Sequence, residues 1–227
     1  MTAGVFVCGT DTGAGKTYVA AALIRDLRER GVRVAGMKPI AAGTEPGSNA
    51  NADVDALAAA DGLDLPASAR NPYAFADPIA PHLAARDAGV AMDLGVIAAA
   101  WREIARIADA IVVEGAGGAR VPIGRGTDML DIARRLRLPV LLVVGLRLGC
   151  LNHARLTADA IAARGLTLAG WVANRIDPLM LRADDNVAEL GRLLPAPLVA
   201  DVGHGAVPSF APASLSRIGF GRLFKAC

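Results

Sequence analysis

A glycine-rich segment near the start of the chain limits the possible folds more than any other feature. Residues 9–17 read GTDTGAGKT and lie between an apolar run and a segment with helical periodicity. Backbone N–H groups in the first turn of a helix have no partners within the helix, and the helix dipole favours an anion there. A Gly-Lys-Thr ending in this context is typical of loops that bind nucleotide phosphates. We therefore predict a phosphate-binding loop, with Lys16 against the phosphates and the Thr17 hydroxyl on Mg²⁺.

The spacing within this loop departs from the common pattern. Gly9 lies one residue further from the Gly-Lys-Thr ending than usual, so Thr10 stands where the first glycine is expected. A glycine-rich stretch alone is more often an ordinary turn. The flanking strand and helix patterns therefore carry the prediction, and the loop is a variant form.

Length and hydropathy indicate a single α/β domain. The chain has 227 residues, which suits one domain with a continuous core. Its hydrophobic content of 53% and mean hydropathy of +0.39 are high, but much of this is alanine, and the apolar run at residues 140–146 is too short to cross a bilayer. The N-terminus leads directly into the first apolar run without the pattern of a secretion signal. We expect a cytoplasmic protein that does not contact membranes.

Charge and cysteine content exclude several classes of protein. The 24 basic and 22 acidic residues give a net charge of +2, which leaves no broad basic surface for nucleic acid. Cys8, Cys150 and Cys227 are too widely spaced for a disulfide framework or a zinc site. We expect reduced thiols and a small anionic ligand.

Short apolar runs alternate with helical patterns along the chain. This alternation predicts an α/β P-loop fold, a mostly parallel sheet with helices on both faces. In such sheets ligands bind beyond the carboxyl ends of the strands. The expected strands are residues 5–8, 33–37, 110–113, 140–145, 168–173 and 197–200; the expected helices are 16–30, 54–60, 94–108, 128–136, 152–163, 182–193 and 214–224; residues 42–51 and 203–212 are expected loops.

Two charged residues stand where expected strands end. Lys38 follows the second strand, and although a lone lysine is often simply solvated, a neighbouring phosphate site would give this cation a catalytic role. Glu114 follows the third strand and precedes glycines that let the backbone approach a ligand. Glu114 is either a solvated strand end or a ligand of Mg²⁺, and its place beside Thr17 in this topology favours the metal.

Two aspartates at the start of the helix expected from residue 54 are further candidates. An acid is a common N-terminal cap, and we interpret Asp53 in this way. Mg²⁺ takes oxygen ligands, so one or two carboxylates would complete a site with a hydroxyl and phosphate oxygens. The spacing alone does not choose between Asp53 and Asp55.

Six segments occur in one order: GTDTGAGKT, KPIAAG at residues 38–43, NPYAFADPIAPH at 71–82, VEGAGG at 113–118, LGCLNHA at 148–154 and LAGWVAN at 168–174. Together they resemble the dethiobiotin synthetase family as far as about residue 200, after which the likeness fades. The resemblance implies closure of a cyclic urea from 7,8-diaminononanoate and CO₂ at the expense of ATP, with Mg²⁺. Dethiobiotin, ADP and phosphate would form through a carbamate and a carbamic-phosphoric anhydride, a step of biotin biosynthesis.

The resemblance also implies roles for individual residues. Lys38 would be the catalytic lysine, assisted by Lys16, and Thr12 would lie beside the reacting amine. Thr17, Asp55 and Glu114 would bind the metal, so that Asp55 is preferred over Asp53. Asn174 would read the adenine edge, although asparagine there is also a common turn residue. ATP would contact Gly13, Ala14, Gly15, Lys16, Thr17, Tyr18, Asp55, Glu114, Gly115, Ala116, Gly117 and Asn174, and the diamine would contact Thr12, Lys38, Ala42, Gly118 and, across a homodimer interface, the helix start at Gly149, Cys150, Leu151 and Asn152.

The sequence departs from the family pattern at two places. Ala42 stands where many relatives have a serine that contacts the substrate, so one hydrogen bond is missing or replaced. Residues 202–205 lack the Ile-Pro pair usual at the edge of the base pocket. His82 and His204 are interpreted as residues without a chemical role, and His153 as part of the interface motif.

Two other classes of protein match part of the pattern. A nucleotide-dependent switch of the partitioning or iron-protein type shares the fold and a variant loop, but usually has an additional lysine early in the loop, where residues 10–12 have none. An amidase-type ligase normally carries a glutamine-hydrolysing domain, for which this chain has no room. The synthetase is favoured over both.

Overall fold

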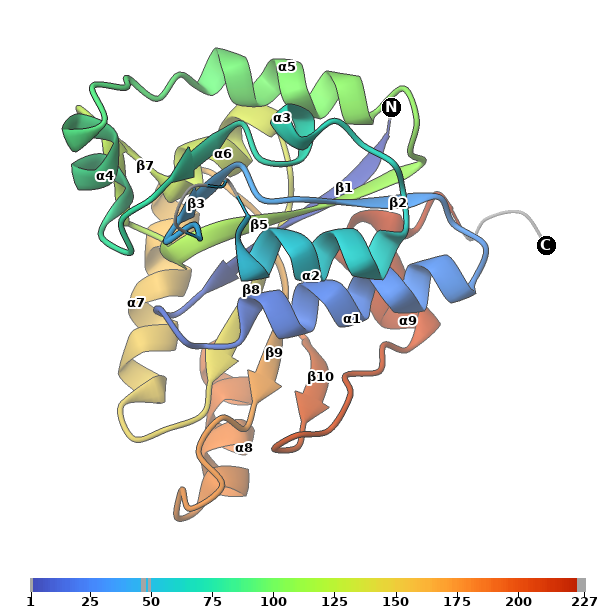
Figure 1. Cartoon of the computed structure of the whole chain (residues 1–227). Coiled ribbons are helices and arrows are strands. Elements are labelled where there is room, and N and C mark those ends of the chain that lie inside the picture. Colours follow the sequence, from blue (N-terminus) through green and yellow to red (C-terminus); the bar gives the residue numbers. More distant parts are fainter. Residues whose placement is uncertain (1, 46–47, 49, 224–227) are drawn as a thin grey trace.

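The computed structural model describes residues 2–45, 48 and 50–223. Its centre is a six-stranded sheet in the order β10-β9-β8-β1-β5-β2, in which every neighbouring pair is parallel (Figure 1). The predicted α/β fold with a parallel sheet is therefore confirmed. The strands are β1 (Ala3–Gly9), β2 (Val34–Met37), β5 (Ala110–Gly118), β8 (Val140–Gly145), β9 (Leu168–Asn174) and β10 (Leu198–Val202).

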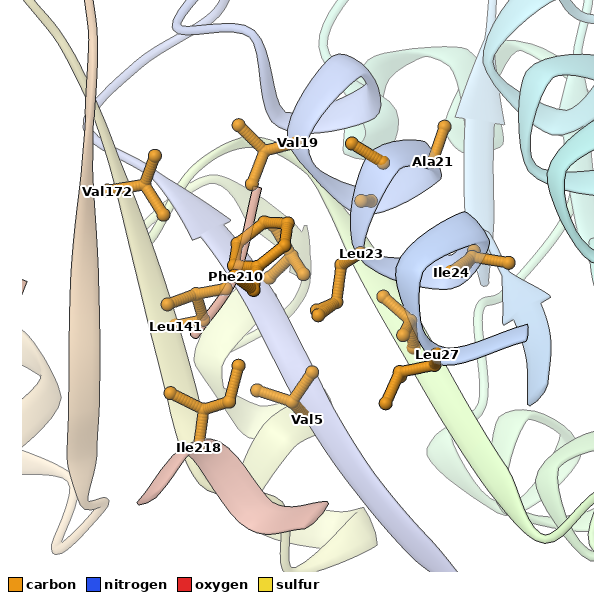
Figure 2. Packing of buried hydrophobic residues seen from close by; sticks show 14 of the residues in the cluster. Val5, Val19, Ala21, Leu23, Ile24, Leu27, Leu141, Val172, Phe210 and Ile218 are labelled. Carbon is orange, nitrogen blue, oxygen red and sulfur yellow. The ribbon is translucent and has the colours of Figure 1, made fainter. Parts of the chain in front are cut away.

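Alternation along β1 divides the core into two layers. Val5 packs with Leu23 and Phe210 on one face of the sheet, whereas Phe6 packs with Ile104 on the other. Successive side chains of a strand point to opposite faces, so a strand that is buried on both faces consists of a continuous apolar run. Figure 2 shows the first layer, where the labelled residues of the first helix and of the C-terminal segment meet over the sheet.

Helices cover both faces of the sheet. Two of them, α1 and α2, lie side by side on one face (Figure 1). On the other face, α5, α6 and α7 pack over β1 and β5, and α7 and α8 together cover β8 and β9. Their bounds are α1 (Lys16–Glu29), α2 (Ala52–Asp61), α5 (Leu94–Ile104), α6 (Met129–Leu136), α7 (Cys150–Ala163) and α8 (Ala183–Leu193).

Several short elements were not predicted. A separate parallel pair of strands, β3 and β4, follows directly from β2, and β6 pairs with β7 in an antiparallel turn. Strands of two or three residues leave no periodic pattern in a sequence, which is why they escaped prediction. These elements are β3 (Ile40–Ala42), β4 (Tyr73–Phe75), β6 (Pro122–Gly124), β7 (Thr127–Asp128), α3 (Ala67–Arg70) and α4 (Pro81–Asp87).

The predicted C-terminal helix over residues 214–224 is wrong in form. The chain has a short helix, α9 (Pro212–Leu215), followed by a π-helical turn, η1 (Ser216–Phe220). Gly219 interrupts that turn with a φ of 115°, a value that no right-handed helix accommodates. Residue 224, where the helix was expected to end, lies outside the described residues. The helix that was expected to run to residue 108 also ends earlier, at Ile104.

Cys8 and Cys150 are free and buried. Burial raises the pKa of the Cys8 thiol to about 12, so this side chain behaves as part of the core. Cys227 lies outside the described residues. Among the helices in the described part of the chain, none has the length and apolar character needed to cross a bilayer.

Candidate functional site

The phosphate loop joins the end of β1 to the start of α1. Gly13 and Gly15 adopt left-handed backbone conformations, with φ of 78° and 87°. Gly15 also has no room for a side chain, because a Cβ there would lie 2.0 Å from the amide nitrogen of Asn174. No side chain caps the first turn of α1. The N–H groups of that turn are therefore available to an anion, as the sequence predicts.

Four side chains from distant segments form a compact cluster beside this loop. The Lys38 Nζ atom lies 2.5 Å from Asp53 Oδ2 and 2.7 Å from Glu114 Oε1. The Thr17 hydroxyl lies within hydrogen-bond distance of the same two carboxylates, at 2.8 Å from Asp53 Oδ1 and 2.7 Å from Glu114 Oε1, and its single proton can be donated to one of them at a time. We call these four residues the lysine–carboxylate cluster. The cluster forms because the chain after β2, the strand β5 and the first turns of α1 and α2 come together at the same edge of the sheet.

The two predicted lysines face one cavity of about 670 Å³. Lys16 bends back over the phosphate loop, where its Nζ atom donates to the Asp11 carbonyl at 3.2 Å. Lys38 reaches the same space from the end of β2. Lys16 and Lys38 therefore line the same cavity. Half of the predicted residues line the cavity: Thr12, Gly13, Gly15, Lys16, Thr17, Lys38, Ala42, Glu114, Ala116 and Gly117.

Burial and the neighbouring charges shift the pKa values in this cavity. Burial lowers the pKa of Lys16, and the like charge of Lys38 lowers it further. Burial would also lower the pKa of Lys38, but Glu114 and Asp53 outweigh it and raise that pKa. Burial raises the pKa of Glu114 although Lys38 opposes the change, whereas Lys38 overcomes burial at Asp53 and lowers its pKa. Lys38 and Asp53 thus stabilise each other's charged forms, whereas burial disfavours the charged forms of Lys16 and Glu114.

The oxygen atoms of the cluster fit a magnesium ion. Glu114 Oε2 is buried and has no hydrogen-bond partner, so it is an acceptor without a donor. Thr17 and Asp53 place two further oxygen-bearing side chains beside it. Within the described residues no group of three His, Cys, Asp or Glu could hold a metal by itself. A metal here would need additional oxygens from a phosphate or from water, which is how Mg²⁺ is usually bound.

The two aspartates of α2 differ in their surroundings. The α2 helix begins at Ala52, two residues earlier than predicted, and its N-terminal cap is Asn51. Asp53 therefore does not cap the helix. Its carboxylate is within hydrogen-bond distance of the Thr17 hydroxyl and the Lys38 ammonium group. Asp55 is exposed, about 200° further around the helix, and contacts neither of them. The geometry therefore favours Asp53 over Asp55, and the metal-binding role of either aspartate stays a prediction.

Three predicted ligand-binding residues have structural contacts. Asn174 is buried at the end of β9, and its amide donates to the Ala14 carbonyl at 2.9 Å, so it supports the phosphate loop from below. Gly115 faces the core, where a Cβ would lie 2.9 Å from the Phe6 ring. Tyr18 donates through its hydroxyl to the Ala206 carbonyl at 2.8 Å and links α1 to the loop after β10. Contact of these residues with a nucleotide stays a prediction.

The start of α7 does not reach the main cavity. Gly149 precedes the helix with a φ of 97°, and no side chain caps its first turn. The helix begins at Cys150, which is buried, while Leu151 is half-buried and Asn152 is exposed. A second cavity, of about 540 Å³, lies between the phosphate loop and α7 and is lined by residues that include Thr12, Gly118, His153 and Leu156.

Sequence reasoning missed several residues of the main cavity. Asn51 lines it and also donates to the Gly43 carbonyl at 3.1 Å. Residues 78–81, which lead into α4 and include its first residue, form another wall. The pattern of an asparagine two residues before an aspartate is an N-cap signal that could have identified Asn51, and with it the start of α2.

Comparisons with known proteins relate the whole chain to one family and one fold. A family described as an AAA domain matches residues 3–206. The chain is 52% identical over 214 residues to the ATP-dependent dethiobiotin synthetase of Aromatoleum aromaticum, covering 92% of this chain and 95% of that one. Among solved structures, it resembles the signal recognition particle receptor FtsY of Elizabethkingia anophelis, with a TM-score of 0.57 and 15% identity over 94% of this chain and 63% of that one. It also resembles the septum site-determining protein MinD of Pyrococcus horikoshii, with a TM-score of 0.55 and 15% identity over the whole chain and 90% of that one. At such identities the structural likeness concerns the fold alone.

Proposed function

Because the chain belongs to the family of ATP-dependent dethiobiotin synthetases, we propose that it closes the cyclic urea of dethiobiotin from 7,8-diaminononanoate and CO₂. One amine adds to CO₂ and loses a proton to give a carbamate. A carbamate oxygen then takes the γ-phosphoryl group of ATP, which releases ADP. The second amine attacks the carbonyl carbon of this mixed anhydride, and phosphate leaves as the ring closes.

The convergence of Lys16 and Lys38 on one cavity carries the proposal. Attack of a carbamate on a triphosphate brings two anions together, so the site must supply positive charge where negative charge accumulates. Lys16 lies on the phosphate loop and serves the triphosphate. Lys38 comes from the opposite wall and serves the carbamate, with Thr12 beside the amine.

Holding the reacting groups in position supplies the rest of the rate enhancement. When the carbamate, the γ-phosphate and the second amine are held in one cavity, the steps become effectively unimolecular, which can lower barriers by roughly 7–11 kcal/mol at best. The ammonium groups of Lys16 and Lys38 also lower the pKa of the substrate amines, which must be neutral to attack. The enclosing walls keep water from the mixed anhydride.

Magnesium would be held by Thr17, Asp53 and Glu114. When bound there, it would neutralise charge on the β- and γ-phosphate oxygens. In the free protein Lys38 holds both carboxylates, so this ammonium group maintains their charge and position until nucleotide arrives. Ala42 offers no hydroxyl to the diamine, and its own carbonyl lies 3.5 Å from the Asn51 amide nitrogen.

A homodimer would complete the diamine site. Leu148, just before α7, and Leu156, which lines the second cavity, are 96% and 60% exposed, and such apolar side chains suit burial against a second copy. The uncapped first turn of α7 would then bind the substrate carboxylate for the partner, because a helix N-terminus favours an anion. A cytoplasmic location is part of the same proposal, since the enzyme depends on ATP and its thiols at Cys8 and Cys150 are free.

A nucleotide-dependent switch is the alternative function. Likeness to MinD supports only the shared fold, because the identity is 15%. The relative with 52% identity is a ligase, and the early lysine of the switch proteins is missing from residues 10–12. The switch is therefore not favoured.

The test is ADP release with Mg·ATP, bicarbonate and 7,8-diaminononanoate. We expect release to depend on the diamine and to fall at least about 100-fold in Lys38→Ala, because a preorganised charge at the reacting oxygens is lost. The control is Arg135→Ala, which changes an exposed cation on α6 and should keep wild-type activity. ADP release that does not depend on the diamine would refute the synthetase function and favour the switch.

A further inference from the structure

The catalytic lysine stands at the end of an edge strand. In the six-stranded sheet β2 pairs only with β5, so one side of its backbone has no neighbouring strand. An edge of this kind presents unpaired N–H and C=O groups and is prone to fray. Lys38 follows β2 directly, so the position of its ammonium group depends on how firmly this edge is held.

Two buried side chains hold the free edge at Gly36. The Gly36 N–H donates to Asp61 Oδ2 at 2.8 Å, and the Gly36 carbonyl accepts from Arg70 Nη1 at 2.9 Å. Asp61 and Arg70 are themselves bound to each other through both branches of the guanidinium group. We call them the edge-strand pair. It occupies the place that a further strand would take, offering one donor and one acceptor to the same residue.

The next residues along the chain hold Lys38 itself. Its N–H donates to the Arg70 carbonyl at 2.9 Å, and its carbonyl accepts from the Asn71 amide at 2.6 Å. The Asn71 amide also donates to the Tyr73 carbonyl at 3.1 Å. Both backbone polar groups of Lys38 are thus bound by residues 70 and 71.

We propose that Arg70, with Asp61 and Asn71, positions Lys38 for the reaction; this inference rests on the proposed function. A planar guanidinium group bound at two points fixes direction as well as distance. The backbone at Gly36 is also closely packed, since a Cβ there would lie 2.7 Å from Leu57 Cβ. The edge strand is therefore clamped at Gly36 and again at Lys38, and the Lys38 side chain starts from a fixed point.

A purely structural role makes a different prediction. The chain has another partly buried arginine between two buried carboxylates, Arg164 with Asp128 and Asp131, which touches neither β2 nor the main cavity. Loss of geometry at either arginine would destabilise the protein. Only at Arg70 would it displace Lys38.

The experiment compares Arg70→Lys and Asn71→Ala, each in the wild type and in Lys38→Gln, with Arg164→Lys as the matched control. Diamine-dependent ADP formation is followed with radiolabelled ATP over hours, so that slow variants remain measurable, and kcat is compared with the KM for ATP. We expect Arg70→Lys to lower kcat about tenfold in the wild type, because small misplacements of a catalytic group are costly, with little change in KM. Asn71→Ala, which leaves no buried charge unpaired, should act in the same direction if Arg70→Lys folds poorly.

The decisive result is the coupling to Lys38. Residues that act through one another show strongly non-additive effects. In the Lys38→Gln background we expect both substitutions to change kcat by less than about twofold. Equal factors in the two backgrounds, or an Arg70→Lys effect no larger than that of Arg164→Lys, would overturn the positioning role. If Lys38→Gln itself kept wild-type activity, the proposed function would fail instead.

Discussion

Two buried charged groups adjoin the short strand β2, one along its free edge at Gly36 and one at Lys38 after its carboxyl end, and they differ in how completely they are paired. In the edge-strand pair, the carboxylate of Asp61 accepts from Gly36, Leu63 and Arg70, and Arg70 also donates to the Leu63 carbonyl at 3.1 Å. In the lysine–carboxylate cluster, Glu114 keeps one buried oxygen without any partner, and a second lysine stands nearby.

This difference in pairing distinguishes a group that stabilises the fold from a group that binds a ligand. A buried charge is tolerated when every polar atom is bound, and such a group fixes geometry. A buried oxygen without a partner costs free energy in the free protein, and it becomes favourable when a cation or donor arrives. The edge-strand pair therefore specifies where the chain lies, and the lysine–carboxylate cluster specifies what the chain binds.

The largest effect is expected where the complete pair is broken. Asp61→Ala would leave the buried Arg70 guanidinium without its counter-ion, and should cost about 3–5 kcal/mol in the free energy of unfolding. Denaturant titration measures this loss. The double variant Asp61→Ala with Arg70→Met removes both charges and should recover part of this loss, because the Gly36 N–H and carbonyl then lose their partners. A loss below about 1 kcal/mol in the single variant would show that the pair is not the complete group described above.

The second-largest effect is expected on the Mg²⁺ requirement, when Glu114 of the lysine–carboxylate cluster is replaced. Glu114→Gln removes a carboxylate with an available oxygen, and should raise the Mg²⁺ concentration for half-maximal activity roughly 10–100-fold, in the range that metal sites lose when their carboxylates are replaced. The KM for the diamine should change much less. Parallel titrations with Mg²⁺ and with diamine measure both. Equal changes in the two would argue against a metal-binding role for Glu114.

A smaller effect tests the two aspartates of α2. Asp53→Asn should weaken Mg²⁺ about tenfold, because its carboxylate lies on Thr17 and Lys38. Asp55→Asn is the matched control, because it makes the same change two residues away at an exposed site. It should leave the Mg²⁺ titration unchanged and should change the free energy of unfolding by no more than about 0.5 kcal/mol. The reverse outcome would restore Asp55 as the ligand.

The smallest expected effect is a gain in stability instead of a loss. Lys16→Met should abolish ATP binding but stabilise the free protein by roughly 0.5–2 kcal/mol, because burial and Lys38 disfavour the charge of Lys16. The pKa of Lys16 is lowered in the folded state, so its charged form costs stability below that pKa. This cost disappears as the pH rises through the lowered pKa toward the ordinary value of 10.5. Denaturation at several pH values should show the gain of the variant shrinking toward alkaline pH; a gain that grows there would contradict this origin.

Prediction succeeded where the signal is carried by neighbouring residues. The phosphate loop and the six strands of the sheet follow from contiguous apolar runs and a glycine-rich turn, and all were located to within a few residues. The aspartate of the cluster was misassigned because its orientation depends on the residue at which α2 begins. A shift of two residues in that start, marked by Asn51, turns a side chain from solvent into the cavity.

The sequence by itself determined the parallel sheet, the phosphate loop and the place of Lys38 directly after a strand, because each depends on a short local pattern. It placed Glu114 directly after a strand, whereas β5 continues to Gly118 and Glu114 lies within it. Only the tertiary structure decided which groups meet. Lys38 and Glu114 are 76 positions apart, and Gly36 and Arg70 are 34 apart. Contacts over such separations depend on how helices and strands pack, a property of the whole core that no single segment encodes.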